Sequence, residues 1–438
     1  MSLESRLLYA LEPWRQAPAW KVAFSGGLDS TVLLHLLARL RQRQALPPIS
    51  AIHVHHGLQP VADAWVEHCR AQCAALKIPL VVRHVQVAAG ASVERAAREA
   101  RYAACAEALG AGDVLLVAQH RDDQAETLLL RLLRGAGVRG LAAMRASRPL
   151  ASGTLLRPLL GVARAELEAW ALAEGLQWVE DPSNRDTSLA RNFLRREIVP
   201  RLTQYWPAAS AVLARDAEQL AEADALLGEL ADLDLQAATA PAQPDWLRLP
   251  SLQLAPLLAL SEARQRNALR EWLRALTLPP EREHWAGWRD LRDAAVDAAP
   301  LWRLAGGELR RAGGRLWWLS GDWLQPPAEP VVDWLVPAQP LALPGNGQVC
   351  LEGQVPEGRL QIRYRQGGEV LDLPGRGHRD LKRLLQESAL PAFVRGRLPL
   401  LYAGAALVAV ANLPQLQMAV ATPLRLRWLP PTGGPGLS

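Results

Sequence analysis

The chain has 438 residues, half of them hydrophobic, and a formal net charge of +5 at pH 7. This length exceeds one ordinary domain, so we expect two or three packed domains. No apolar stretch approaches the roughly 20 residues of a membrane-spanning helix, which argues against a membrane partner. The charged start is unlike a secretory signal and the 4 cysteines suggest no disulfide framework, so a cytoplasmic location is expected.

The first 120 residues alternate between strand and helix patterns. Continuous apolar runs predict strands at 21–24, 49–54, 80–87 and 113–118. Amphipathic runs predict helices at 31–42, 62–76 and 93–109. The alternation predicts an α/β fold with a doubly wound, mostly parallel sheet. Ligands in such sheets bind beyond the carboxyl ends of the strands, which is where three polar loops fall.

The first of these loops reads Ser25-Gly26-Gly27-Leu28-Asp29-Ser30. Glycines before a helix let the backbone approach a phosphate, and the first helical N–H groups have no internal partner. Ser25 and Ser30 add hydroxyl donors, and Asp29 places a carboxylate where Mg²⁺ can bridge to phosphates. The loop matches neither the Gly-Lys-Ser/Thr motif nor the dinucleotide fingerprint. A tight turn without a ligand is the alternative.

Two other strand ends carry candidate groups. His55 and His56 lie in a turn, where one imidazole can reach a phosphate or a base; a structural or solvated role is the alternative. Asp122 and Asp123 open the helix after the fourth strand. They suit Mg²⁺ binding or the deprotonation of an amine, and capping of the helix is the alternative.

Two arginine-containing segments suit a polyanion. Arg134 and Arg139 flank the glycines of a loop, although a surface loop without a ligand is an equal alternative. Arg191 and Arg195 are four residues apart, beside Asn192, and therefore share one helix face. That spacing suits phosphates, with a solvated helix face as the alternative.

The rest of the chain reads as a long helix at 207–235, helices near 260–276 and 280–296, and a short β pattern with a Gly-Gly turn. A Pro-rich stretch at 326–344 has the composition of a linker. The last part mixes short strands with one helix at 379–387. We therefore expect domains at 1–206, 207–330 and 345–438, the second helical and the third a small α+β domain.

In order and spacing, the motifs from residue 21 to about 200 resemble those of the tRNA(Ile)-lysidine synthetase family, within the pyrophosphate-loop ATP pyrophosphatases. The matching motifs are S-G-G-L-D-S, H-H-G-L, R-E-A-R-Y, H-x-x-D-D-Q-x-E-T, R-G-x-G-x-x-G-L, R-P-L-L, D-P-S-N-x-D and R-N-x-x-R. Residues 375–401 resemble the last domain of that family, and the middle matches only in length and helical character. Arg139 departs from the acidic or small residue that relatives often carry.

The resemblance implies an adenine nucleotide α-hydrolase-like catalytic domain, followed by two tRNA-contacting domains. It implies that ATP adenylates the wobble cytidine of the CAU-anticodon tRNA(Ile), and that free L-lysine then attacks C2 to give lysidine, AMP and pyrophosphate. The implied cofactors are ATP and Mg²⁺. Monomer and homodimer stay open as alternatives.

The resemblance also assigns roles to residues. The implied ATP-binding residues are Ser25, Gly26, Gly27, Leu28, Asp29, Ser30 and His55. The implied catalytic residues are Asp29, Asp122 and Asp123, with Asp29 and Asp122 as metal ligands. The implied tRNA-binding residues are Arg134, Arg139, Arg191, Asn192, Arg195, Arg376, His378, Arg379, Lys382 and Arg383.

Three rival functions share parts of this pattern. A pyrophosphate-loop tRNA thiolase needs C-x-x-C pairs, which the sequence lacks. An amidotransferase ligase needs an N-terminal cysteine or a glutaminase module, and neither is evident. A non-catalytic tRNA-binding protein that senses ATP stays open, and AMP formation from ATP and lysine only in the presence of tRNA would argue against it.

Overall fold

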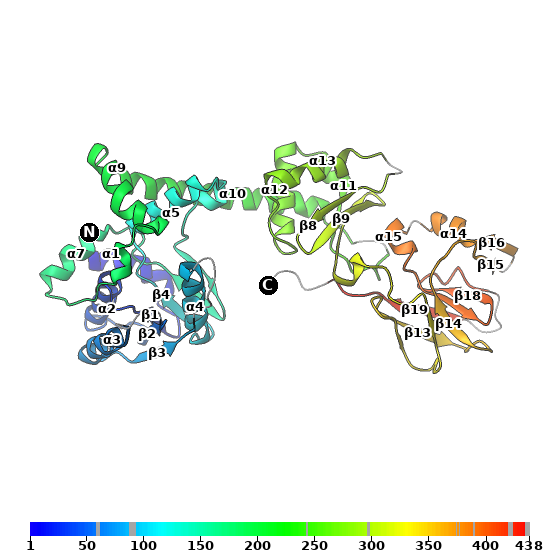
Figure 1. Ribbon diagram of the computed structural model, residues 1–438, viewed down its shortest axis with the longest axis horizontal. Helices are drawn as coiled ribbons and strands as arrows, with labels where there is room; N and C mark the ends of the chain where they lie inside the picture. The colour runs from blue at the N-terminus through cyan, green and yellow to red at the C-terminus, as the bar shows by residue number, and fades with distance from the viewer. Residues whose placement is uncertain are drawn as a thin grey trace. The chain divides into compact units, whose positions relative to one another are not determined.

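The computed structural model (Figure 1) describes residues 1–57, 62–86, 93–241, 244–295, 298–373, 375, 377–388, 390–418 and 424–433. Contacts divide the chain into two compact units, Met1–Leu226 and Leu227–Ser438. Within the described residues, no helix is both long and apolar enough to cross a bilayer.

The first unit is built on a six-stranded sheet in the order β3-β2-β1-β4-β6-β5. Its strands are β1 (Trp20–Ala23), β2 (Ile49–His55), β3 (Leu80–His84), β4 (Val114–Leu116), β5 (Ser147–Leu150) and β6 (Gly153–Leu156). All neighbouring strands pair in parallel except β5, which runs antiparallel to β6. The predicted mostly parallel sheet is confirmed.

Helices cover both faces of this sheet. The helices up to the end of α10 are α1 (Leu3–Leu11), α2 (Leu28–Leu40), α3 (Ala62–Leu76), α4 (Val93–Glu107), α5 (Arg121–Leu133), α6 (Val138–Leu141), α7 (Arg164–Ala173), α8 (Ala190–Phe193), α9 (Val199–Tyr205) and α10 (Ala209–Ala238). Alternate residues of β4 enter different cores. Val114 and Leu116 pack with α1, α2, α3 and α7, whereas Leu115 packs with Cys105 of α4. The sheet is therefore doubly wound, as predicted.

The strand order fixes where a ligand can bind. The chain builds β2 and β3 on one side of β1 and then returns to place β4 on the other side. In sheets of this type, ligands bind beyond the carboxyl ends of the strands at such a change of direction. The loops after β1 and β4 meet there.

The second unit begins within α10 and continues with a four-stranded antiparallel sheet, in the order β7-β10-β9-β8. The strands are β7 (Ser251–Gln253), β8 (Leu301–Leu304), β9 (Gly307–Ala312) and β10 (Arg315–Ser320), and the helices are α11 (Leu254–Leu258), α12 (Glu262–Leu273) and α13 (Trp285–Asp293). The expected Gly-Gly turn joins β9 to β10, with φ of +56° at Gly313 and +70° at Gly314. This region is thus less purely helical than expected.

The remainder consists of short strands and two short helices. They are β11 (Val331–Asp333), β12 (Leu341–Ala342), β13 (Gln348–Gly353), β14 (Leu360–Arg363), β15 (Val370–Leu373), β16 (Gly377–Asp380), β17 (Leu400–Ala403), β18 (Ala406–Val410), β19 (Leu424–Leu429), α14 (Leu381–Glu387) and α15 (Ala392–Arg395). The predicted combination of short strands with a helix near 379–387 is confirmed.

The Pro-rich stretch 326–344 is not a free linker, contrary to its composition. It contributes β11, which pairs with β14, and β12, which pairs with β13. Trp334 and Leu343 are 3% and 2% exposed and lie in a core that also holds Trp317 and Leu319 of β10. The burial of these apolar side chains outweighs the linker-like proline content, so β10 and the C-terminal strands share one core.

Candidate active site

The loop after β1 is shaped so that only glycine fits at position 26. Gly26 has φ of +81°, and a Cβ there would lie 3.0 Å from the Cys69 Sγ and 3.2 Å from Val179. The Val179 N–H also donates to the Gly26 carbonyl at 2.9 Å. Gly27 then caps α2 in an extended conformation. The sequence-predicted loop therefore has the close-packed, helix-opening form of a phosphate site.

The two predicted serines of this loop face each other. Ser25 Oγ lies 3.0 Å from Ser30 Oγ, and Ser30 Oγ donates to the Gly27 carbonyl at 3.1 Å. The Leu28 side chain is buried in the core, so its backbone N–H is what it can offer to a nucleotide. The loop thus combines two hydroxyls with free helical N–H groups.

Asp29 and His120 bring the first and third predicted clusters together. Asp29 Oδ2 lies 3.6 Å from His120 Nε2, and Asp29 Oδ1 is buried with no hydrogen-bond partner among the described residues. His120 is 1% exposed and caps α5: its Nδ1 accepts from the Asp123 N–H, while Asp123 Oδ2 accepts from the His120 N–H. Burial lowers the pKa of His120, but the bond to Asp29 and three nearby carboxylates outweigh it, so that pKa is raised.

A buried ionic network lies beside this pair. The carboxylates of Asp123 and Glu126 are 12% and 3% exposed. Arg191 donates to both of them, at 3.1 and 3.0 Å. Arg195 also donates to both, at 2.8 Å to Asp123 and 2.6 Å to Glu126. Burial raises the pKa of Asp123, but the charges of His120, Arg191 and Arg195 outweigh it, so that pKa is lowered.

Asp122 occupies a more open position than Asp123. Its side chain is 29% exposed, and its Oδ2 lies 3.7 Å from His120 Nδ1. The same oxygen accepts from the Arg164 N–H, at the start of α7, at 2.8 Å. Within the described part of the chain, no group of three or more His, Cys, Asp or Glu side chains is arranged around a common metal position.

His55 ends β2, one strand away from the loop after β1. Its Nε2 lies 3.2 Å from Asp63 Oδ1, and its ring centroid is 4.8 Å from that of His84. On the same strand, His53 Nδ1 lies 2.9 Å from the carbonyl oxygen of Phe24, the residue that precedes the loop. A contact of His55 with nucleotide stays a prediction.

The predicted tRNA-binding residues fall into three groups. Arg134 and Arg139 are exposed, whereas Arg191 and Arg195 face the buried carboxylates. Asn192 is buried and donates to the carbonyls of Ser183 and Asp186, both at 2.9 Å, so it shapes the neighbouring loop. The third group is exposed on β16 and α14 and consists of His378, Arg379, Lys382 and Arg383. Arg376 lies outside the described residues.

The sequence interpretation missed His120 and Glu126 as members of the site. Both belong to the run His120 to Thr127, in which the sequence pattern predicts a function only for Asp122 and Asp123. The available signal was the histidine at the strand end. A polar side chain there precedes a helix and faces the loop of the neighbouring strand.

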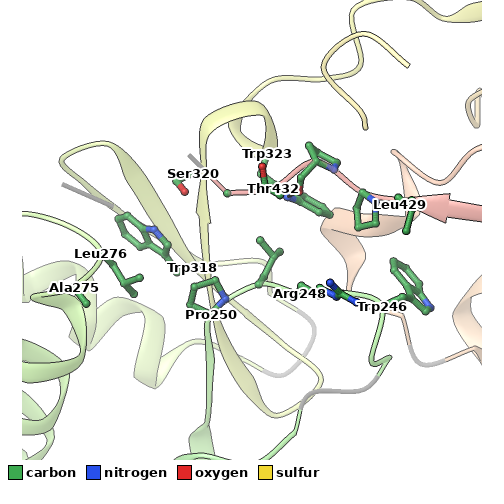
Figure 2. A pocket seen from close by; sticks show the side chains of 14 residues that line it. Trp246, Arg248, Pro250, Ala275, Leu276, Trp318, Ser320, Trp323, Leu429 and Thr432 are labelled. Carbon is green, nitrogen blue, oxygen red and sulfur yellow. Dashed lines mark hydrogen bonds between the residues drawn. The ribbon is translucent and has the colours of Figure 1, made fainter. Parts of the chain in front are cut away.

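A pocket of about 500 Å³ lies wholly in the second unit (Figure 2). Three tryptophans, Trp246, Trp318 and Trp323, contribute to its walls together with Arg248. Its described lining contains no carboxylate, histidine or cysteine. The groups suited to acid–base chemistry lie instead at the carboxyl edge of the sheet in the first unit.

Comparison with known proteins identifies the family of the chain. Family models match the PP-loop domain over residues 1–202, the TilS substrate binding domain over 252–317 and the TilS substrate C-terminal domain over 360–428. The chain is 62% identical to the tRNA(Ile)-lysidine synthase of Pseudomonas aeruginosa, covering 100% of this chain and 99% of that protein. It is 60% identical to the tRNA(Ile)-lysidine synthase of Pseudomonas fluorescens, again covering 100% of this chain and 99% of that protein. It is 44% identical to the Escherichia coli O157:H7 enzyme, covering 89% of this chain and 91% of that protein. The chain therefore belongs to the tRNA(Ile)-lysidine synthase family.

Proposed function

We propose that this chain is an ATP-dependent ligase that forms lysidine on tRNA(Ile). It joins the ε-amine of free L-lysine to C2 of the wobble cytidine in the CAU anticodon and releases AMP and pyrophosphate. One observation carries the proposal: Asp29 Oδ2, in the loop after β1, lies 3.6 Å from His120 Nε2. The same histidine lies near the carboxylates of Asp122 and Asp123. A nucleotide site and an amine-handling site therefore adjoin.

The glycine loop suits the triphosphate of ATP. In the first step, the C2 carbonyl oxygen of cytidine attacks the α-phosphorus and pyrophosphate leaves. Gly26, Gly27 and the first N–H groups of α2 can hold the charge that develops on the leaving group. Ser25 and Ser30 bond to each other in this state, and turning either hydroxyl outward supplies a further donor.

Asp29 and Asp122 would hold Mg²⁺. The buried Asp29 Oδ1 without a partner fits this ion, because Mg²⁺ is usually bound through one or two carboxylates together with substrate phosphates. When bound, the ion supplies positive charge next to the phosphates.

Asp122 and Asp123 are candidates for handling the amine of lysine. An alkyl ammonium with a pKa near 10.4 must lose a proton before it attacks C2. Asp123 has a lowered pKa, which keeps it ionised and favours attraction of the ammonium over uptake of its proton. Asp122 is 29% exposed and therefore accessible to the amine, so it is our candidate for accepting that proton. AMP leaves as the new C–N bond forms.

The exposed basic side chains would hold tRNA. Arg134 and Arg139 belong to the first unit, and His378, Arg379, Lys382 and Arg383 belong to the second. Contact of both units with one tRNA would raise affinity through two tethered sites. A cytoplasmic location fits this substrate and stays a prediction.

The proposal is tested with the full chain, unmodified CAU-anticodon tRNA(Ile), ATP and radiolabelled lysine. We expect AMP formation that requires tRNA, and label in the tRNA at the wobble position. A protein that binds tRNA and ATP but forms neither product would be a non-catalytic binding protein, contrary to the proposal.

A further inference from the structure

A cluster of arginines surrounds Tyr102 in the first unit. Arg98 lies one turn before Tyr102 on α4, with its guanidinium carbon 5.1 Å from the ring centroid, and it donates to the Tyr102 hydroxyl at 3.2 Å. The guanidinium carbon of Arg148, on β5, is 5.2 Å from the same centroid. Two cations from different elements therefore share one aromatic ring.

Two further arginines complete the cluster. Arg157 follows β6, is 6% exposed, and donates to the Arg145 carbonyl at 2.7 Å and to the Gln119 side chain. Arg131 of α5 donates to the carbonyls of Gly140 and Ala143, at 2.8 and 2.7 Å. We call Arg98, Arg131, Arg148 and Arg157 the arginine cluster.

The hydrogen-bond partners of the arginine cluster are neutral. They are backbone carbonyls, the Gln119 amide and Tyr102, and no carboxylate among the described side chains forms an ion pair with any of the four. Burial, and more weakly the charges of Arg148 and Arg98, lower the pKa of Arg157 despite an opposing effect of Tyr102. Burial and then Arg98 lower the pKa of Arg131. Like charges held together without a counter-ion cost free energy that a bound anion would offset.

The arginine cluster adjoins the candidate active site. Gln119, which accepts from Arg157, directly precedes His120 in the chain. Arg157 follows β6, which is parallel to β4, so it lies at the carboxyl edge that also carries the loop after β1. Arg131 donates to the carbonyl of Gly140, and it therefore holds the backbone next to the exposed Arg139.

We infer that Arg98 and Arg148, which share the Tyr102 ring, bind phosphates of the RNA backbone beside the nucleotide that reacts. The inference rests on the proposed function and adds the residues that seat the anticodon loop. These two cations come from α4 and β5, and the charges of Arg131 and the buried Arg157 lie near enough to interact with them. Arginines from two different elements suit neighbouring phosphates of a chain better than one small anion.

The test uses the full chain with Arg98→Gln and Arg148→Gln combined. Binding of unmodified CAU-anticodon tRNA(Ile) is measured over a range of NaCl concentrations. Each lost phosphate contact should reduce the log–log salt slope by roughly 0.7–0.9 and, together, the two should weaken binding by about tenfold or more at low salt. ATP affinity should not change. Arg95→Gln is the control, because Arg95 lies on the same helix, is 79% exposed and pairs with Glu99 instead.

Two results would overturn the inference. One is an unchanged salt slope and tRNA affinity in the double variant, with folding verified by thermal unfolding. The other is a raised KM for lysine or ATP with an unchanged slope, which would assign the arginine cluster to a small substrate. If the double variant does not fold, Arg148→Gln alone is measured, and Arg148→Lys should keep the slope. Because tRNA binding needs no turnover, normal binding by wild type without lysidine formation would refute only the proposed function.

Discussion

The charged groups of two regions are arranged in opposite ways. At the sheet edge of the first unit, Glu126 is 3% exposed and bonded to both Arg191 and Arg195. On β16 and α14 of the second unit, His378 and Arg383 are each 80% exposed, with single carboxylates 3.9 and 3.4 Å away. One region holds its charges in a fixed internal network, and the other presents them to solvent.

This contrast separates two jobs that arginine performs. A buried, multiply bonded guanidinium fixes the position of carboxylates, and its loss leaves an uncompensated charge. An exposed cation contributes little to stability but attracts a polyanion in a salt-dependent way. Mutations in the two regions should therefore differ in which measurement they change.

The largest effect is expected for Asp29→Asn. The amide keeps the shape of the side chain but removes the negative charge beside the phosphates and His120. Pyrophosphate release that depends on tRNA should fall by about 10³-fold or more. Thermal unfolding should be little changed. Near-normal release would mean that the loop after β1 has another role.

Glu126→Gln should destabilise the network by about 3 kcal/mol, because both arginines lose a charged partner in a largely buried setting. Hydrogen exchange of peptides from α5 and α8, measured by mass spectrometry, reports this loss locally. Glu197→Gln is the matched control, since Glu197 is 46% exposed and lies 3.8 Å from Arg201. That change should cost less than about 1 kcal/mol. Equal effects would show that the network contributes no more than a surface pair.

The sequence predicted those parts of the site that are encoded locally. The run Ser25 to Ser30 follows β1 closely and contains the glycines and the helix start within six positions, so its conformation follows from adjacent residues. The placement of Asp122 and Asp123 near this loop followed from a general property of parallel sheets. Both expectations needed no knowledge of distant contacts.

The partners of Arg191 and Arg195 were not predictable in the same way. Their carboxylates lie 65 to 72 residues earlier in the chain, and helical spacing says only that the two arginines share a face. Which surface that face meets is decided by tertiary packing. The segment 326–344 is a similar case, because proline content indicates a linker but Trp334 and Leu343 bury themselves in the C-terminal core.

A smaller effect concerns the protonation of His120. Its pKa is raised in the folded chain, so its contribution to stability is complete below the unfolded value of about 6.5 and is lost as pH rises through the folded value. Asp29→Asn removes a hydrogen bond and a charge that raise this pKa. The NMR titration midpoint of the His120 ring should therefore fall, with His120→Gln used for assignment.

The matched control for this titration is Asp63→Asn, which removes a carboxylate 3.2 Å from His55 and should leave the His120 midpoint unchanged. Asp123 should behave in the opposite sense to His120. The pKa of Asp123 is lowered in the folded chain. Its contribution to folding stability is therefore complete above the unfolded pKa of about 3.9 and is lost as pH falls through the folded value. A His120 midpoint that does not move in Asp29→Asn would contradict the interaction between these two side chains.

The smallest effect is expected for Arg379→Gln combined with Lys382→Gln. Both side chains are exposed in the second unit, so we expect unchanged unfolding and less than a tenfold rise in the Kd for tRNA at low salt. The difference from wild type should vanish near 1 M salt, because the Debye length there is only about 3 Å. Arg359→Gln is the control, since Arg359 is balanced by Asp333 at 2.6 Å. A loss of affinity that persists at high salt would mean that these residues make fixed contacts, as in the buried network, and the contrast between the two regions would then fail.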